Sequence, residues 1–281
     1  MADYSKDVIA IREWLRKEPC LPQDFDDFVL RKFVHSCHGS LERSKQCLER
    51  FCSSRAAMGE VYCGRDPAGS GLQTAFRITT VATYPADDHE LLIHQLDDPG
   101  LENLDFYNVL KAFAIQADYW IKHHDAFPVG HIIVIDIKDY TLRIIPKVNI
   151  MFFRDFLIYL LEAMPVRVKA VHIVNAPSYY DKLYSLVKPV LPAEIRKIVQ
   201  FHASVSSLHN CVPPRHLPAE LGGDAPSMRQ QHRDWVVKIE DERKWYLDDS
   251  KWKADKKFKS KNNNNNSEQN FNGSFRTLSI D

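Results

Sequence analysis

The sequence lacks the short motifs that mark most enzyme and metal sites. It contains no G-x-S-x-G, H-E-x-x-H, C-x-x-C or G-x-G-x-x-G, so a serine nucleophile, a zinc hydrolase centre and dinucleotide binding are all disfavoured. The scattered histidines do not show metal-ligand spacing, and no motif around Cys211 marks it as a catalytic nucleophile. These scattered histidines include His123, His124, His172, His202, His209 and His216. We therefore expect no enzyme activity, no cofactor and no metal.

Charge of one sign and long apolar runs are also missing. Lys and Arg together number 37, as do Asp and Glu, which argues against a nucleic-acid partner. No apolar run reaches the ~18 residues that a membrane span needs. The six cysteines form no paired framework, no hydrophobic segment follows Met1, and the C-terminus carries no lipidation cysteine. We expect a cytoplasmic protein with reduced thiols.

The most informative stretch extends from Gly130 to His202. Two nearly continuous β-branched runs, His131–Ile137 and Val168–Val174, are typical of parallel strands that are covered on both faces. Between them, Asn149–Glu162 has ten apolar residues in fourteen positions, more than one face of a surface helix requires. This excess indicates either burial all round or a wall that faces an apolar space.

A short amphipathic helix is predicted over Tyr179–Leu191, directly after the second strand. Leu183, Leu186, Val187 and Val190 fall on one side, and Pro189 and Pro192 separate the segment from its neighbours. Such a helix is suited to be a lid over an apolar cavity. The alternative is an ordinary cover helix of an α/β sandwich, which the pattern alone favours.

The whole chain predicts an α/β fold with a largely parallel sheet, preceded by a small all-helical module. Helices are expected at residues 7–17, 24–38, 41–58, 104–122, 193–201 and 229–244, and a further strand at residues 87–96. The expected divisions are an N-terminal helical module (1–60), the α/β domain (72–225), a C-terminal helical extension (226–247) and a disordered Lys- and Asn-rich tail (248–281).

Several blocks in this order resemble the CRAL-TRIO lipid-binding family, and in particular its insect alpha-tocopherol-transfer-like and retinaldehyde-binding branch. They include I-R-E-W-L-R-K-E-P (Ile11–Pro19), M-P-V-R-V-K-A-V-H-I-V-N-A-P (Met164–Pro177) and L-P-A-E-L-G-G (Leu217–Gly223). The resemblance implies a hydrophobic cavity that is floored by the sheet and closed by a mobile helical gate at about Asn175–Val199.

The resemblance also implies which residues line the cavity, although each is equally suited to be ordinary core. The expected lining residues are Phe113, Ala117, Trp120, Ile133, Ile135, Phe152, Phe156, Tyr159, Leu160, Met164, Val168, Val171 and Ile173, together with Leu183, Leu186, Val187 and Val190 of the gate. Arg167, Lys169, Lys188, Arg196 and Lys197 are the expected phosphoinositide or membrane contacts. Glu194 and Ile198 stand where the resemblance leads us to expect basic residues, and Ala203 replaces a glycine.

Two functions from different classes remain open at this point. In the first, a monomeric carrier binds a tocopherol, retinoid, carotenoid or other lipid and transfers it to or from membranes, with phosphoinositides as candidate partners. In the second, bound ligand or phosphoinositide regulates an interaction protein in membrane trafficking or signalling. We expect a cytoplasmic protein that contacts membranes peripherally.

Overall fold

The computed structural model describes residues 3–189 and 191–255, and these residues form two compact units. The first unit combines the N-terminal residues up to Gly59 with residues 158–165 and the segment that begins at Ser250. The second unit contains residues 60–157 and 166–249. Each unit is described separately below.

The first unit is a helical module with a buried arginine in its core. Its helices are α1 (Ser5–Leu15), α2 (Asp27–Ser36) and α3 (Leu41–Ala57). The carboxylate of Asp26 caps α2 by accepting from the Phe28 N–H. Arg55 is fully buried; its Nη1 donates to the Tyr159 hydroxyl at 3.2 Å, and its guanidinium lies 4.5 Å from the centre of the Phe51 ring. The three predicted N-terminal helices are confirmed.

The expected disordered tail is wrong for its first residues. Trp252 is only 4% exposed and stacks on Phe25, with 5.9 Å between ring centres. The backbone N–H of Ala254 donates to the Cys52 carbonyl at 3.1 Å. An aromatic residue among the lysines anchors this segment, a signal that composition alone does not register. The five consecutive asparagines lie outside the described residues.

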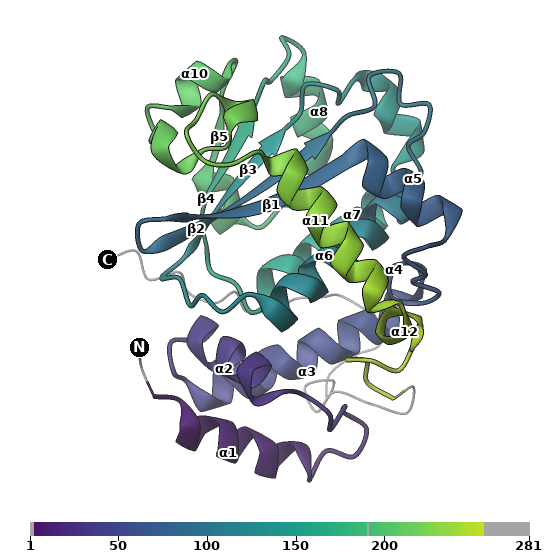
Figure 1. Ribbon diagram of the computed structural model, residues 1–281, viewed down its shortest axis with the longest axis vertical. Coiled ribbons are helices and arrows are strands. Elements are labelled where there is room, and N and C mark those ends of the chain that lie inside the picture. Colours follow the sequence, from purple (N-terminus) through teal and green to yellow (C-terminus); the bar gives the residue numbers. More distant parts are fainter. Residues whose placement is uncertain (1–2, 190, 256–281) are drawn as a thin grey trace. The chain divides into compact units, whose positions relative to one another are not determined.

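The second unit contains a five-stranded sheet with the order β1-β2-β3-β4-β5 (Figure 1). β1 (Thr79–Ala86) pairs antiparallel with β2 (His89–Leu96). The other strands all run parallel to β2; they are β3 (His131–Asp136), β4 (Val168–Val174) and β5 (Val199–Phe201). The predicted, largely parallel sheet is confirmed, with one antiparallel edge strand.

Helices connect the strands and cover the sheet of the second unit. Their bounds are α4 (Gly59–Tyr62), α5 (Ser70–Ile78), α6 (Phe106–His123), the 3-10 helix η1 (Leu142–Lys147), α7 (Ile150–Glu162), α8 (Tyr180–Val187), α9 (Ala193–Ile198), α10 (Val205–Leu208), η2 (Pro214–His216), η3 (Ala219–Leu221), α11 (Met228–Asp241) and α12 (Arg243–Leu247). The last turn of α7 groups with the first unit. The helix expected over residues 193–201 ends at Ile198, because its last three residues form β5.

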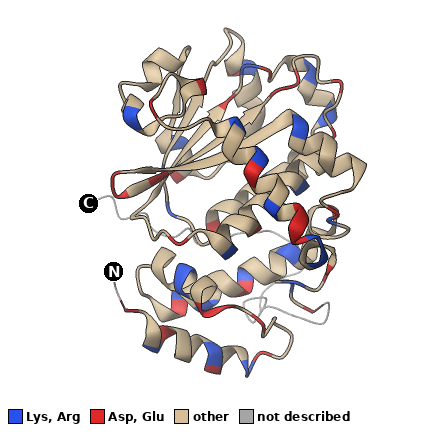
Figure 2. Cartoon of the chain, viewed as in Figure 1, with Lys and Arg blue, Asp and Glu red and all other residues tan. Residues whose placement is uncertain are grey.

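The C-terminal extension packs within the second unit. Ile239 of α11 and Tyr246 of α12 are fully buried in one cluster with Phe76 of α5 and Tyr119 of α6. Figure 2 shows charged residues of both signs on the helices and loops, while the strands carry few of them. The sheet therefore offers mainly apolar side chains to both of its covering layers.

Candidate functional site

One face of the sheet is sealed by protein. Leu91, Ile93, Val134 and Val174 have no exposed surface, and they pack in one cluster with side chains from the end of α10, the start of α11 and the segment between them. The covering residues are Leu208, Val212, Leu217, Leu221 and Met228. Such complete burial is the normal state of a close-packed interior.

The opposite face is equally apolar but only half-buried. The strand register aligns its side chains in two rows, which are Leu92–Ile133–Val171–Val199 and His94–Ile135–Ile173–Phe201. Every one of these residues retains partial exposure, although β3 and β4 are interior strands of the sheet. Because interiors are closely packed, partial accessibility along a whole face of apolar side chains is unusual for interior strands.

Aromatic side chains from two helices flank this face. The Phe113 ring of α6 lies 6.0 Å from the His94 ring and 6.3 Å from the Phe156 ring of α7. Phe152 and Leu157 of α7 remain half-buried. The predicted residues Phe113, Ile133, Ile135, Val171 and Ile173 are therefore brought together. Val168 and Ala117 are also half-buried, on β4 and α6.

His94 is a residue of this face that the sequence analysis missed. Burial lowers its pKa to about 4, and His232 reinforces the shift. The ring is thus neutral at physiological pH and offers a hydrogen-bonding group among apolar neighbours. Leu92, Val199 and Phe201 were also missed, and the strand alternation together with the register would have placed them on the face.

The structure does not place four of the predicted lining residues on this face, and their role stays a prediction. Trp120 is 6% exposed, and its Nε1 donates to the buried Glu90 carboxylate at 3.2 and 3.3 Å. Tyr159, Leu160 and Met164 group with the first unit, where Tyr159 is 2% exposed and packs on Phe51. Phe156 is also 2% exposed. These side chains were assigned from the family resemblance, and an apolar side chain at such a position serves equally well in a cavity wall and in ordinary core.

The predicted gate helix α8 has no buried residue. Its Tyr180 and Tyr184 rings contact the Phe201 ring, with centres 4.7 and 4.9 Å apart. Leu183 and Val187 are half-buried, and Leu186 is 37% exposed. Val190 lies outside the described residues. The structure thus shows a helix without buried side chains, and its role as a gate stays a prediction.

The basic residues expected at a membrane surface gather at the edge where the parallel strands begin. Val171 pairs with Val199, and Lys169 of β4 and Lys197 of α9 each lie two residues before this pair along the chain. Arg196 Nη1 donates to the Lys188 carbonyl at 3.4 Å. Lys169, Lys188, Arg196 and Lys197 are exposed.

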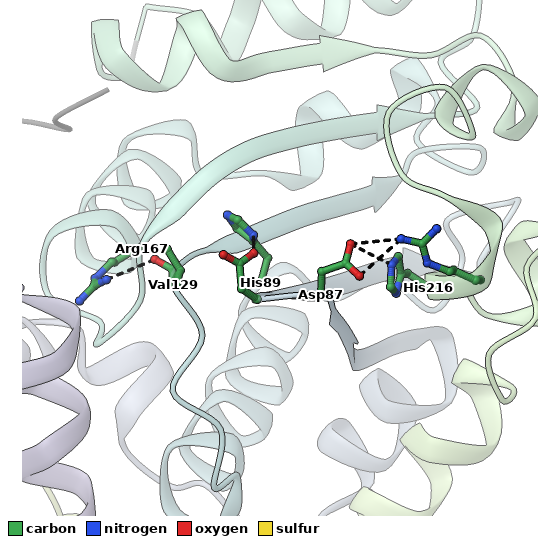
Figure 3. A network of polar contacts seen from close by, with 7 residues as sticks. Asp87, His89, Val129, Arg167 and His216 are labelled. Atoms are coloured by element: carbon green, nitrogen blue, oxygen red, sulfur yellow. Dashed lines mark hydrogen bonds and ion pairs between the residues drawn. The ribbon is translucent and has the colours of Figure 1, made fainter. Parts of the chain in front are cut away.

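Arg167 lies at the same edge and is half-buried. It donates through Nη1 to the Val129 carbonyl at 3.2 Å (Figure 3). The same view includes the β1–β2 turn, where Asp87 binds Arg215 and His216. At Gly130 a side chain would collide with Lys169, so this glycine leaves room for the aliphatic stem of Lys169.

A separate surface pocket of about 400 Å³ lies where α6 and α7 begin. It is lined by Leu104, Asp105, Phe106, Tyr107, Pro146, Lys147, Val148 and Asn149. Asn149 Nδ2 donates to the Tyr107 hydroxyl across it at 3.1 Å. The pocket shares no residue with the half-buried sheet face.

Comparisons with known proteins define the class of this protein. Residues 87–223 match the CRAL/TRIO domain, and residues 1–72 match the Pinta-like UBA domain. The crystal structure of Sfh5 aligns over 87% of this chain and 99% of that chain, with a TM-score of 0.53 and 14% identity, so it shares the fold. The helical N-terminus and the α/β sheet agree with these matches.

Residues 87–223 form a CRAL/TRIO domain, so this part of the chain belongs to the CRAL-TRIO family. The alpha-tocopherol transfer protein-like proteins of Mus musculus and Homo sapiens are each 28% identical to it over 224 residues, which is 78% of this chain and 65% of theirs. Clavesin-1 of Xenopus laevis is 30% identical over 122 residues, 43% of this chain and 37% of that protein. The chain thus spans less than two thirds of these relatives, and the expected insect branch stays a prediction.

Among the helices at residues 3–189 and 191–255, none has the length and apolar character needed to cross a membrane.

Proposed function

We propose that this protein is a non-enzymatic carrier that binds one hydrophobic small molecule against the half-buried sheet face. The observation that supports it is the contrast between the two faces of the sheet: Val134 and Val174 have no exposed surface, while Ile133, Ile135 and Ile173 are partly accessible. Neighbouring residues of one strand experience opposite environments. A terpenoid-sized ligand would complete the burial on the open side.

Burial of the ligand supplies most of the binding free energy. Removing roughly 400 Å² of apolar ligand surface from water is worth about 10 kcal/mol before the costs of association are subtracted. Few polar contacts are needed. The neutral His94 ring is placed to orient a hydroxyl or carbonyl group of the ligand. A tocopherol, a retinoid or a carotenoid satisfies these demands, and the tocopherol in the name of two relatives makes it the first ligand to test.

Membranes release the ligand by favouring an open position of α8. When the helix swings out, Leu183, Leu186 and Val187 exchange ligand contact for bilayer contact. The exposed Lys188, Arg196 and Lys197 then approach anionic headgroups, each worth about 1 kcal/mol near the surface. Only such a differential interaction shifts the equilibrium between closed and open states. Phosphoinositides are the proposed anionic lipids.

Native mass spectrometry of the purified protein tests the carrier function. We expect one apolar small molecule per chain, released intact by organic solvent, and reloading by α-tocopherol or retinol when the stripped protein is mixed with vesicles. Chemical conversion of the ligand by the protein would contradict the proposal, as would a stripped protein that takes up no apolar compound from a cell lipid extract. Capture of a protein partner only in the loaded state would instead favour the regulated interaction protein.

A further inference from the structure

Two histidines and a cysteine converge on the sealed side of the sheet, away from the proposed ligand face. The nitrogens His172 Nδ1 and His202 Nε2 are 2.9 Å apart. Together with the Cys211 thiol, the ligand atoms of these residues all lie within 4.8 Å of one another. His172 and His202 are 3% and 6% exposed, whereas Cys211 is exposed.

The three residues come from different elements that the fold brings together. His172 lies on β4, where it pairs with Gln200 of β5. His202 follows two residues after Gln200 on the same face, and its backbone N–H donates to the Ile173 carbonyl at 2.8 Å. Cys211 follows α10, where its N–H donates to the Leu208 carbonyl at 2.8 Å. Ordinary backbone contacts thus fix the position of each residue, so the cluster is preorganised.

The hydrogen bonds of Ser207 determine which nitrogen of His202 carries its proton. The Ser207 hydroxyl donates to the Ser204 carbonyl at 2.8 Å, so towards His202 Nδ1, at 3.4 Å, it acts as an acceptor. His202 Nδ1 is therefore protonated, and the lone pair of Nε2 points into the cluster. A metal-bound histidine commonly has this arrangement, with the second ring nitrogen donating to an outer group.

We propose that His172 Nδ1, His202 Nε2 and Cys211 Sγ bind a divalent zinc-class ion. Imidazole and thiolate are the ligands that Zn²⁺ prefers, and tetrahedral bonds of about 2.0 Å to nitrogen and 2.3 Å to sulfur separate ligand atoms by roughly 3.3–3.6 Å. The observed nitrogen pair needs to open by only about 0.4 Å from 2.9 Å. Binding at Nδ1 requires the proton of His172 to move to Nε2, which keeps the ring neutral, and the Cys211 thiol releases its proton to solvent as it becomes a thiolate.

The fourth coordination position of the ion remains for water or for the side chain of Gln200. Its Oε1 already accepts from the Cys211 thiol at 3.6 Å. The exposed side of Cys211 gives the ion a route of entry to two otherwise buried rings. A bound ion would tie β4, the end of β5 and the segment after α10 together. The ion would therefore stabilise this edge of the sheet. The same edge contains Phe201, whose ring contacts Tyr180 and Tyr184 of α8.

Metal titration of the full chain, stripped with a chelator, tests the site. We expect one Zn²⁺ per chain, a thiolate-to-metal charge-transfer band with Co²⁺, and an increase in Tm with Zn²⁺. Cys211→Ser should abolish the band and the Tm increase, and should weaken Zn²⁺ affinity about tenfold or more. His202→Gln should weaken it comparably.

Matched controls separate this cluster from adventitious binding. Cys20→Ser and His209→Gln alter residues of the same kinds outside the cluster, and both variants should retain one Zn²⁺ and the Co²⁺ band. Because Cys211 is exposed, its serine variant should fold normally, which circular dichroism checks. The proposal is overturned if the wild-type chain takes up no Zn²⁺ at micromolar concentration, or if Cys211→Ser binds as tightly as Cys20→Ser.

Discussion

Glu90, at the beginning of β2, keeps its negative charge although it is 2% exposed. His124 Nε2 lies 2.6 Å from one carboxylate oxygen and His131 Nε2 lies 3.5 Å from the other. Burial alone would raise the pKa of Glu90, but the hydrogen bonds and charges of the two histidines outweigh it and lower the pKa to about 2. A cluster of this kind links α6, β2 and β3 through polar contacts.

The lowered pKa of Glu90 makes the stability of the protein sensitive to acid. Its ordinary pKa is 4.5, so the ionised carboxylate stabilises the fold fully above that pH and the contribution is lost as the pH falls towards 2. The contribution is at most about 3 kcal/mol. Glu90→Gln should be less stable at pH 7 and should lose less stability between pH 4.5 and 2.5 than the wild type does.

Urea unfolding as a function of pH measures this effect. Glu102→Gln, at an exposed position, serves as the control and should follow the wild-type profile. Parallel pH profiles for Glu90→Gln and wild type would show that the histidines do not hold the pKa of Glu90 low.

At the level of the elements, the sequence predicts the interior strands and long helices well. The second apolar run coincides with β4 (Val168–Val174), and the helix between the two runs coincides with α7. Long periodic segments carry enough residues to define their own structure. β5 has three residues that continue a helical pattern, and it becomes a strand only because β4 lies beside it.

The candidate site is less predictable because it depends on the pairing of strands. The face is defined by the rows that the register builds, and His94 joins it only through its alignment with Ile135. The zinc-class cluster is even less visible, since His172 lies on β4, His202 follows β5 and Cys211 follows α10. Sequence spacing detects metal ligands that lie on one helix or strand, but it misses ligands that come from three different elements.

The gate assignment predicts that a charge on the apolar side of α8 impairs transfer and leaves binding nearly intact. Leu186→Asp should slow the transfer of α-tocopherol between vesicles several-fold, because the open helix can no longer insert into the bilayer. Ser185→Asp places the same charge on the neighbouring exposed residue and should transfer at the wild-type rate. Equal rates in both variants would mean that α8 is a fixed cover.

A double variant tests the contribution of anionic lipid to the rate of ligand transfer. Arg196→Glu combined with Lys197→Glu should remove the acceleration of transfer by phosphoinositide in the acceptor vesicles, while transfer to neutral vesicles stays unchanged. An acceleration that persists would assign the headgroup contact to other residues.

At the scale of the whole molecule, each unit is organised around a buried cation. The first has Arg55; in the second, Arg65 and Asp118 form an ion pair at 2.5 Å, with both side chains 1% exposed. The guanidinium of Arg65 also lies 5.7 Å from the ring centres of Trp245 and Tyr246. The C-terminal α12 is thereby held to α6, which explains why the expected extension is part of the second unit.

Removing the acid of this pair should destabilise the second unit strongly. Asp118→Asn leaves the buried Arg65 guanidinium without its counter-charge. We expect this change to lower the free energy of unfolding by about 3–5 kcal/mol. Asp66→Asn removes the acid from an exposed pair with Arg243 and should cost far less. Urea unfolding of both variants compares them, and similar losses would contradict the importance of burial.

The central claim is that the two faces of one sheet serve different purposes, and neighbouring residues of β3 test it most directly. Ile135→Trp should fill the open space, lower the affinity for α-tocopherol, retinol or a ligand from a cell lipid extract by about tenfold or more, and change the free energy of unfolding by less than about 1 kcal/mol. Val134→Trp enters the sealed face and should destabilise the fold by about 1–3 kcal/mol or more. If Ile135→Trp loses as much stability as Val134→Trp and still binds apolar ligand normally, then the half-buried face is core and the proposed binding site is wrong.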